Sequence, residues 1–125
     1  MGLIEIHLED LCGVWPHATG EPRADGTHLI TVPAMVLPPG WNQTVTTVQF
    51  LAPVGYPLAH PDCFWADEGL RLGDGRLPKN AGVQPPPFGG AQKLWFSWHV
   101  STWNGSRDTL RSFVGAVANR FTTIE

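Results

Sequence analysis

The stretch GYPLAHPDCFWADEGLRLGDG, residues 55–75, determines how the middle of the chain is interpreted. It begins with the pair Tyr56–Pro57, carries a second proline at Pro61, and places Cys63 just before two large aromatic residues. Because proline presets φ and is disfavoured inside a sheet, Tyr56 and Pro57 predict a turn at the end of a strand, with the phenol bonded to a local partner. A short strand is expected to begin near Cys63.

Two segments before this turn have the composition of strands. Residues 27–37 are β-branched and apolar, and Pro33 within them predicts a bulge or an edge position. Residues 44–52 alternate between two faces, which is the clearest strand pattern in the chain. Residues 21–26, EPRADG, have turn chemistry and predict a hairpin. Residues 3–12 fit a short helix or a strand equally well.

The chain after the turn changes from irregular to helical. Residues 67–92 are rich in proline and glycine and show no periodicity, which predicts a long irregular loop. From residue 104 onward one apolar stripe recurs at helical spacing, with Ser106 as the expected N-cap. The stripe consists of Leu110, Phe113, Val114, Val117 and Phe121. Strands followed by a covering helix indicate an α+β fold.

Composition narrows the function classes. The net charge is −3 and only two lysines occur, Lys79 and Lys93, so no basic stripe supports nucleic-acid binding. No apolar run is long enough for a membrane span, and the first ten residues lack the basic start of a signal peptide. Two cysteines form no disulfide framework. These features predict one domain over residues 1–125, a cytoplasmic location, and no membrane, metal or cofactor.

The motifs together resemble a known family. A strand ending in GYP, Pro61, an irregular loop, Trp103 and an amphipathic helix are similar to the ubiquitin-conjugating enzyme fold. More closely, GYPLAHPDCFWADEGLRLGDG followed by LWFSWHVSTWNGSRDTLRSF resembles the bacterial ubiquitin-conjugating-like proteins of prokaryotic family E. The resemblance covers about residues 26–121. It implies a four-stranded antiparallel meander, with the C-terminal helix packed on one face and the long loop between them.

The resemblance also implies a function. Such a protein receives or holds a ubiquitin-like modifier delivered by an activating-enzyme homologue, and the alternative is a non-catalytic binding module that scaffolds either partner. The family's fold motif falls on Tyr56, Pro57, Pro61 and Trp103. In conjugating enzymes the catalytic cysteine precedes the tryptophan and the helix, whereas residues 93–103 contain no cysteine here.

His99 is the first candidate for chemistry in that cysteine-free window. An imidazole could accept the acyl group itself, or act as general base for the hydroxyl of Ser97 or Ser101 or for an incoming amine. The other interpretation is a histidine hydrogen-bonded among Trp95, Trp98 and Trp103, which are themselves expected to pack in the core or fix loops.

Cys63 and the remaining histidines are expected to be structural. A free cysteine beside Phe64 packs as a small hydrophobe, and burial would raise the pKa of its thiol and leave it inert. His60 and Cys63 have ligand-like spacing, but one such pair is a weak metal signal. A hydrolase built on the His/Trp cluster is a third, less supported function. His7, His17 and His28 are expected to be structural or exposed.

Overall fold

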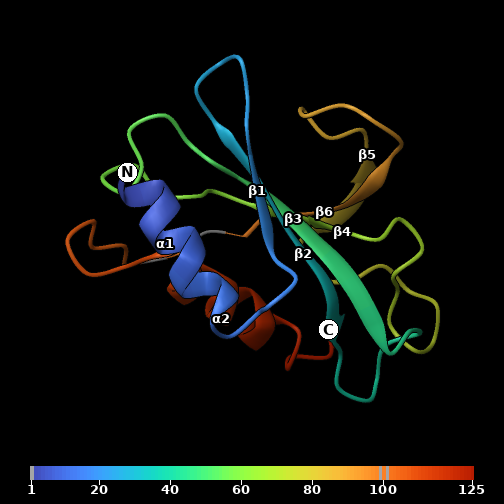
Figure 1. The fold of residues 1–125 in the computed structure, drawn as a ribbon. Coiled ribbons are helices and arrows are strands. Elements are labelled where there is room, and N and C mark those ends of the chain that lie inside the picture. The colour runs from blue at the N-terminus through green and yellow to red at the C-terminus, as the bar shows by residue number, and fades with distance from the viewer. Residues whose placement is uncertain (1, 99, 101) are drawn as a thin grey trace.

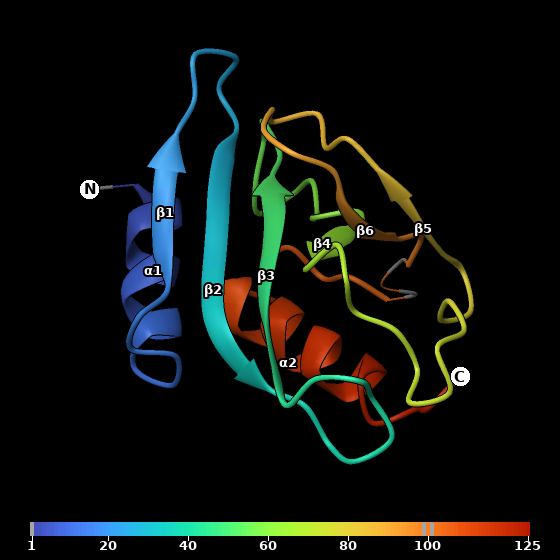
Figure 2. The same cartoon turned by 90° about the vertical axis from the view of Figure 1, so that its right-hand side faces the viewer.

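The computed structural model describes residues 2–98, 100 and 102–125 as one sheet with two helices on one of its faces (Figure 1). The strand order is β1-β2-β3-β4-β6-β5 and neighbouring strands are antiparallel. In Figure 2 helix α1 lies behind β1, and α2 crosses behind the middle of the sheet beside it. The elements are α1 (Leu3–Cys12), β1 (Thr19–Pro22), β2 (His28–Val36), β3 (Val45–Ala52), β4 (Phe64–Ala66), β5 (Ala81–Gln84), β6 (Lys93–Phe96) and α2 (Leu110–Arg120).

The α+β class is confirmed, but the described sheet has six strands where the sequence predicts four. Strand β5 lies inside residues 67–92, which were expected to be irregular throughout, and β6 opens the aromatic segment that follows. Strand β6 is inserted between β4 and β5. The four residues of β5 are all half-buried on a sheet edge, so their sequence does not alternate between apolar and polar residues. The strand also lies among prolines and glycines, and for both reasons its sequence does not predict a strand.

The predicted strand features before the turn are confirmed. Strands β1 and β2 form the hairpin, with Pro22 paired to His28. The register of β2 against β3 shifts between Val32 and Met35, so Pro33 lies at a bulge. Residues 3–12 form a helix, which resolves the ambiguity of their pattern.

Helix α2 carries four members of the predicted apolar stripe, and the fifth, Phe121, is its C-cap residue; all five are buried. Its N-cap, however, is Thr109 and not Ser106: the Thr109 hydroxyl accepts the backbone N–H of Ser112, whose hydroxyl accepts the N–H of Thr109 in return. Ser106 instead donates to the side chain of Asn104 in the preceding turn. The reciprocal capping box satisfies two backbone donors at once, and this fixes where the helix begins.

The core lies between α2 and the sheet. Along β3 every second residue is buried, which places Phe50 against Phe113 of α2 with ring centroids 4.6 Å apart. Phe64 of β4 stacks on Phe96 of β6 at 4.6 Å, and both contact Phe121. This aromatic layer joins β6, which is additional to the predicted strands, to the rest of the sheet.

The loop between β4 and β5 is also held by specific contacts. Leu70 and Leu72 are buried, and the side chain of Asn42 donates to the carbonyl of Gly69 while accepting the N–H of Arg71. The loop is therefore packed onto the connection between β2 and β3. In the described part of the chain, no helix combines the length and apolar character that crossing a bilayer requires.

Candidate functional site

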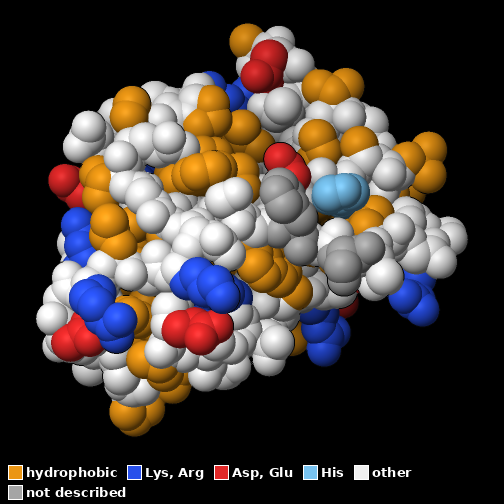
Figure 3. All heavy atoms as spheres, turned by 180° about the vertical axis from the view of Figure 1, so that it is seen from behind, with side chains coloured by type: hydrophobic (Ala, Val, Ile, Leu, Met, Phe, Trp, Pro, Cys, Tyr) orange, Lys and Arg blue, Asp and Glu red, His pale blue; other side chains and the backbone are white. Residues whose placement is uncertain are grey.

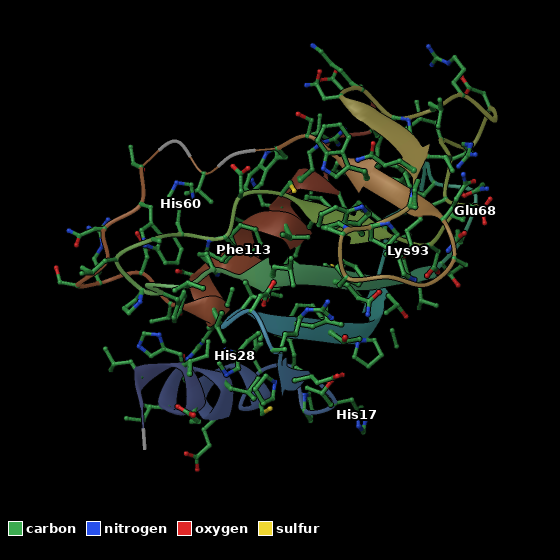
Figure 4. All side chains as sticks on the ribbon, turned by 90° about the horizontal axis from the view of Figure 1, so that it is seen from above. His17, His28, His60, Glu68, Lys93 and Phe113 are labelled. Atoms are coloured by element: carbon green, nitrogen blue, oxygen red, sulfur yellow. The ribbon has the colours of Figure 1, made fainter. Side chains whose placement is uncertain are left out.

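The turn after β3 and the segment leading into α2 are in close contact. The indole N–H of Trp103 donates to the carbonyl of Pro57, with a nitrogen–oxygen distance of 2.7 Å. Gly105 lies so near the turn that a Cβ on it would be 2.8 Å from the same carbonyl oxygen. Segments 46 residues apart in sequence are thus fixed against each other. Figure 4 shows His60 of this turn at the end of the molecule away from Glu68 and Lys93.

Tyr56 connects this turn to helix α1. Its hydroxyl lies 2.7 Å from Nδ1 of His7, and the two rings pack edge to face with centroids 5.5 Å apart. Burial raises the pKa of Tyr56 well above its ordinary value, so the phenol stays protonated at neutral pH. The expectation of a local partner for the phenol is wrong, because the partner is 49 residues away in sequence. His7 is structural, as predicted.

His60 lies beside Trp103 on the same turn. The ring centroids are 6.1 Å apart, and Nδ1 of His60 is 2.8 Å from the carbonyl oxygen of Pro61. A carbonyl can only accept, so Nδ1 carries a proton. This bond fixes the orientation of the His60 ring at the edge of the site.

Cys63 lies on the sheet face opposite the core. Its neighbour Phe64 points into the core, so alternation turns Cys63 the other way, where it lines a pocket together with Trp65. The prediction that Cys63 packs in the core is wrong: the side chain is half-buried and stands outside the core cluster. Burial raises the pKa of its thiol, partly offset by a hydrogen bond from the Trp95 side chain, so the predicted direction of the shift is confirmed.

A comparison with protein-family models gives the family. The model described as prokaryotic E2 family E matches residues 18–123, which is most of the chain. The chain belongs to prokaryotic E2 family E. It is a ubiquitin-conjugating-enzyme-like (E2-like) protein. Searches of curated proteins and of solved structures found no significant match.

The structure brings three of the four E2 motif residues together. Tyr56 and Pro57 form the turn, and Trp103 contacts both, through a ring-centroid distance of 6.3 Å to Tyr56 and the bond to Pro57. Pro61 is buried a few residues further on, and its carbonyl holds His60. The motif residues of this E2-like chain therefore form the packed structure beside which the candidate site lies.

The structure describes only one of the three candidate residues for chemistry. Ser97 is half-buried directly after β6, and its backbone N–H donates to the carbonyl of Asn80 at 2.8 Å. His99 and Ser101 lie outside the described residues. The residue of this site that sequence reasoning missed is His60. It carried a signal, since it lies within the Tyr-Pro stretch, but it was considered there solely as a metal ligand.

The surface of this E2-like protein shows no metal cluster in its described part. Within residues 2–98, 100 and 102–125, no group of three or more His, Cys, Asp or Glu side chains could hold a metal ion. The view from behind in Figure 3 shows hydrophobic side chains reaching the surface in several patches between scattered charged ones. Such patches are more typical of contact with another protein than of nucleic-acid binding.

Cys63 is expected to alkylate more slowly in the folded protein than in the unfolded chain at pH 8. The thiolate is the reactive form, and a raised pKa lowers the thiolate fraction at every pH below it. The rate with iodoacetamide, measured at Cys63 by peptide-mapping mass spectrometry, should keep rising beyond pH 9. The same residue in 8 M urea is the matched control. Faster reaction in the folded state at pH 7 would instead reveal an activated thiol.

Proposed function

We propose that the chain receives or holds the C-terminus of a ubiquitin-like modifier, delivered by an activating-enzyme homologue, without a cysteine thioester. The observation that carries the proposal is the contact of Trp103 with Pro57 in a chain of the prokaryotic E2 family. This contact holds the end of the cysteine-free segment 93–103 against the Tyr-Pro turn. The low pKa that a nucleophilic thiol needs is not found at Cys63.

His99 is the residue we propose for the chemistry, on the basis of its sequence position. In the direct form, a ring nitrogen attacks the thioester carbonyl of the modifier on the activating enzyme. A nitrogen–carbon bond forms, the carbon–sulfur bond breaks, and the enzyme's thiolate leaves and takes a proton. A substrate amine then displaces the imidazole and forms an amide. In the indirect form, His99 takes the proton from Ser97, Ser101 or the incoming amine.

A non-covalent holding role is the second candidate. It is favoured by the absence of cysteine from residues 93–103 together with the half-burial of Cys63. The same contact surface would then position the modifier or the activating enzyme for another catalyst. Both candidates require a complex with the modifier system, and they differ in whether a covalent bond forms.

The experiment combines the protein with the activating-enzyme homologue and modifier from the same genome, with ATP, and analyses the mixture by denaturing mass spectrometry. A covalent role predicts an adduct of the modifier's mass less one water in the unsubstituted protein. The adduct should be lost in His99→Ala and kept in Cys63→Ala. His17→Ala is the matched histidine control, because His17 is exposed and lies in the connection between α1 and β1.

The remaining outcomes separate the two candidates. A stable complex in gel filtration without any adduct supports the holding role. An adduct that survives His99→Ala and disappears in Cys63→Ala contradicts the assignment of His99. If neither an adduct nor a complex forms with any component, the proposed function is wrong.

A further inference from the structure

Strand β5 forms one outer edge of the described sheet. Among the described residues its partner strand is β6 alone, and Figure 2 shows β5 on the outside of the sheet. An edge strand has one row of backbone N–H and C=O groups that no neighbouring strand binds. A peptide in the extended conformation is the partner that such a row fits, because it supplies acceptors and donors at the same spacing.

The outward backbone groups of β5 belong to Ala81 and Val83. At the start of the strand the N–H of Ser97 donates to the carbonyl of Asn80 at 2.8 Å, in line with the register of β5 against β6. Hydrogen-bonded and non-hydrogen-bonded pairs alternate along an antiparallel ladder, so the second and fourth residues of β5 also bond to β6. The N–H and C=O groups of Ala81 and Val83 therefore point away from the sheet. No hydrogen bond joins them to another described residue.

The ends of β5 limit how much of a peptide can pair with it. Asn80 has a positive φ of 60°, which turns the backbone out of the extended conformation. Residues 85–87 are three prolines, which have no N–H to donate. The outer face beside the edge is open, since a Cβ on Gly82 would meet no atom within 4 Å. The edge therefore suits a short extended tail that pairs with the four residues of β5.

The position of the candidate site sets the direction of the added strand. A strand antiparallel to β5 runs in the same direction as β6 and ends near Asn80 and Ser97. Ser97 begins the segment 97–103, in which the proposed function places the chemistry. A tail in this direction would end about 10 Å from Ser97, which is two strand spacings. A parallel strand would instead end at the prolines, at the far end of β5.

Charge at the Asn80 end suits a C-terminal carboxylate. Lys79 is exposed and directly precedes this end of the strand. Arg120 donates to the carbonyl of Lys79 at 3.2 Å, but it also donates to the carbonyl of Glu125, whose charge offsets its own. In the turn before Lys79, Asp74 and Arg76 pair with each other. Lys79 is therefore the cation that remains for a tail carboxylate.

We propose that the C-terminal tail of the modifier adds to β5 as an antiparallel strand. Its backbone bonds to the outward groups of Ala81 and Val83, and its terminal carboxylate lies beside Lys79. This inference rests on the proposed function and assigns the modifier's tail a path along the sheet edge. Because backbone groups make the bonds, the pairing depends on the extended shape of the tail and little on its side chains.

The test uses the unsubstituted protein and an N-acetylated peptide of the modifier's last six residues with a free carboxylate. N-methylation of the peptide removes one backbone N–H at a time. Binding measured by isothermal titration should fall roughly tenfold at every second residue, where a hydrogen bond is lost and the methyl group blocks β5, and change little at the residues between. Saturating peptide should also slow amide hydrogen exchange at Ala81 and Val83 more than at Gly82 and Gln84.

Substitutions in the protein test the same contacts. Val83→Pro removes an outward N–H and should weaken peptide binding roughly tenfold, whereas the control Val83→Ala keeps the N–H and should bind as the unsubstituted protein does. Lys79→Ala should weaken binding roughly 1.5- to 5-fold, as expected for an exposed ion pair, and this difference should disappear at high salt. Lys93→Ala is the matched control, because Lys93 lies opposite Gln84 at the far end of the β5–β6 pair.

The outcomes distinguish this inference from the function beneath it. If the whole modifier binds but N-methylation has no alternating effect and exchange at Ala81 and Val83 is unchanged, the β5 assignment is wrong while the proposed function stands. Weaker binding in Lys93→Ala but not in Lys79→Ala would contradict the direction of the tail. If the protein alone is a dimer that Val83→Pro dissociates, a second copy occupies the edge and the assignment fails. If no modifier binds the unsubstituted protein, the proposed function itself is overturned.

Discussion

Replacing Phe64 with alanine is expected to lower the free energy of unfolding by about 3–5 kcal/mol, the usual cost of removing a buried phenylalanine. Phe64 is fully buried, and its ring stacks on Phe96 at 4.6 Å and meets the edges of Trp98 and Phe121 at 6.2 and 5.7 Å. Because domains are stable by only about 5–15 kcal/mol, the loss is large. The midpoint of urea denaturation, followed by tryptophan fluorescence, measures it.

Phe88→Ala is the matched control for this substitution. Phe88 is a half-buried phenylalanine outside the core and packs edge-on against Trp65, so its removal should cost about 1 kcal/mol. If Phe64→Ala fails to fold, Phe64→Leu keeps an apolar side chain and should fold with a smaller loss. Equal midpoints for the two alanine variants would show that the aromatic layer does not join β4, β6 and α2 as described.

The same aromatic layer explains which parts of the fold the sequence could predict. Strand β3 and helix α2 each bury one face along their length. Their sequences therefore show apolar residues with a period of two in the strand and about 3.6 in the helix. Strand β5 is short, half-buried and on an edge, and it has no such period. Residues 3–12 satisfy both periods, and only packing against α2 and β1 makes them a helix.

Only some residues of the candidate site could be predicted from the sequence. They are the ones named by the family resemblance or oriented by the alternation of side chains along a strand. The resemblance singled out Tyr56, Pro57 and Trp103 as motif residues, and the structure adds that Trp103 contacts the other two. Strand alternation could have corrected the prediction for Cys63, since a core-facing Phe64 turns its neighbour outward. The bond between Tyr56 and His7 could not be anticipated, because it depends on how α1 docks beside α2 and local sequence does not encode this.

Gly105→Ala is expected to lower the free energy of unfolding by about 1–3 kcal/mol, as overpacking commonly does. A Cβ at this position would lie 2.8 Å from the Pro57 oxygen and 3.0 Å from Cα of Leu58, and both are backbone atoms that cannot rotate away. Residues 102–109 must therefore move off the turn, which disrupts the bond from Trp103 to the same oxygen. Hydrogen exchange should accelerate in residues 102–109 and stay unchanged in β2 and β3.

Gly115→Ala is expected to change the free energy of unfolding in the opposite direction. Gly115 is an exposed residue inside α2, and a Cβ there would meet no atom within 4 Å. Alanine should therefore stabilise the protein by about 0.5–1 kcal/mol through helix propensity alone. If the proposed function is right, Gly105→Ala also weakens modifier binding whereas Gly115→Ala does not. Unchanged stability and unchanged exchange in Gly105→Ala would mean that the turn and the segment before α2 are not packed together, and the site would lose its support.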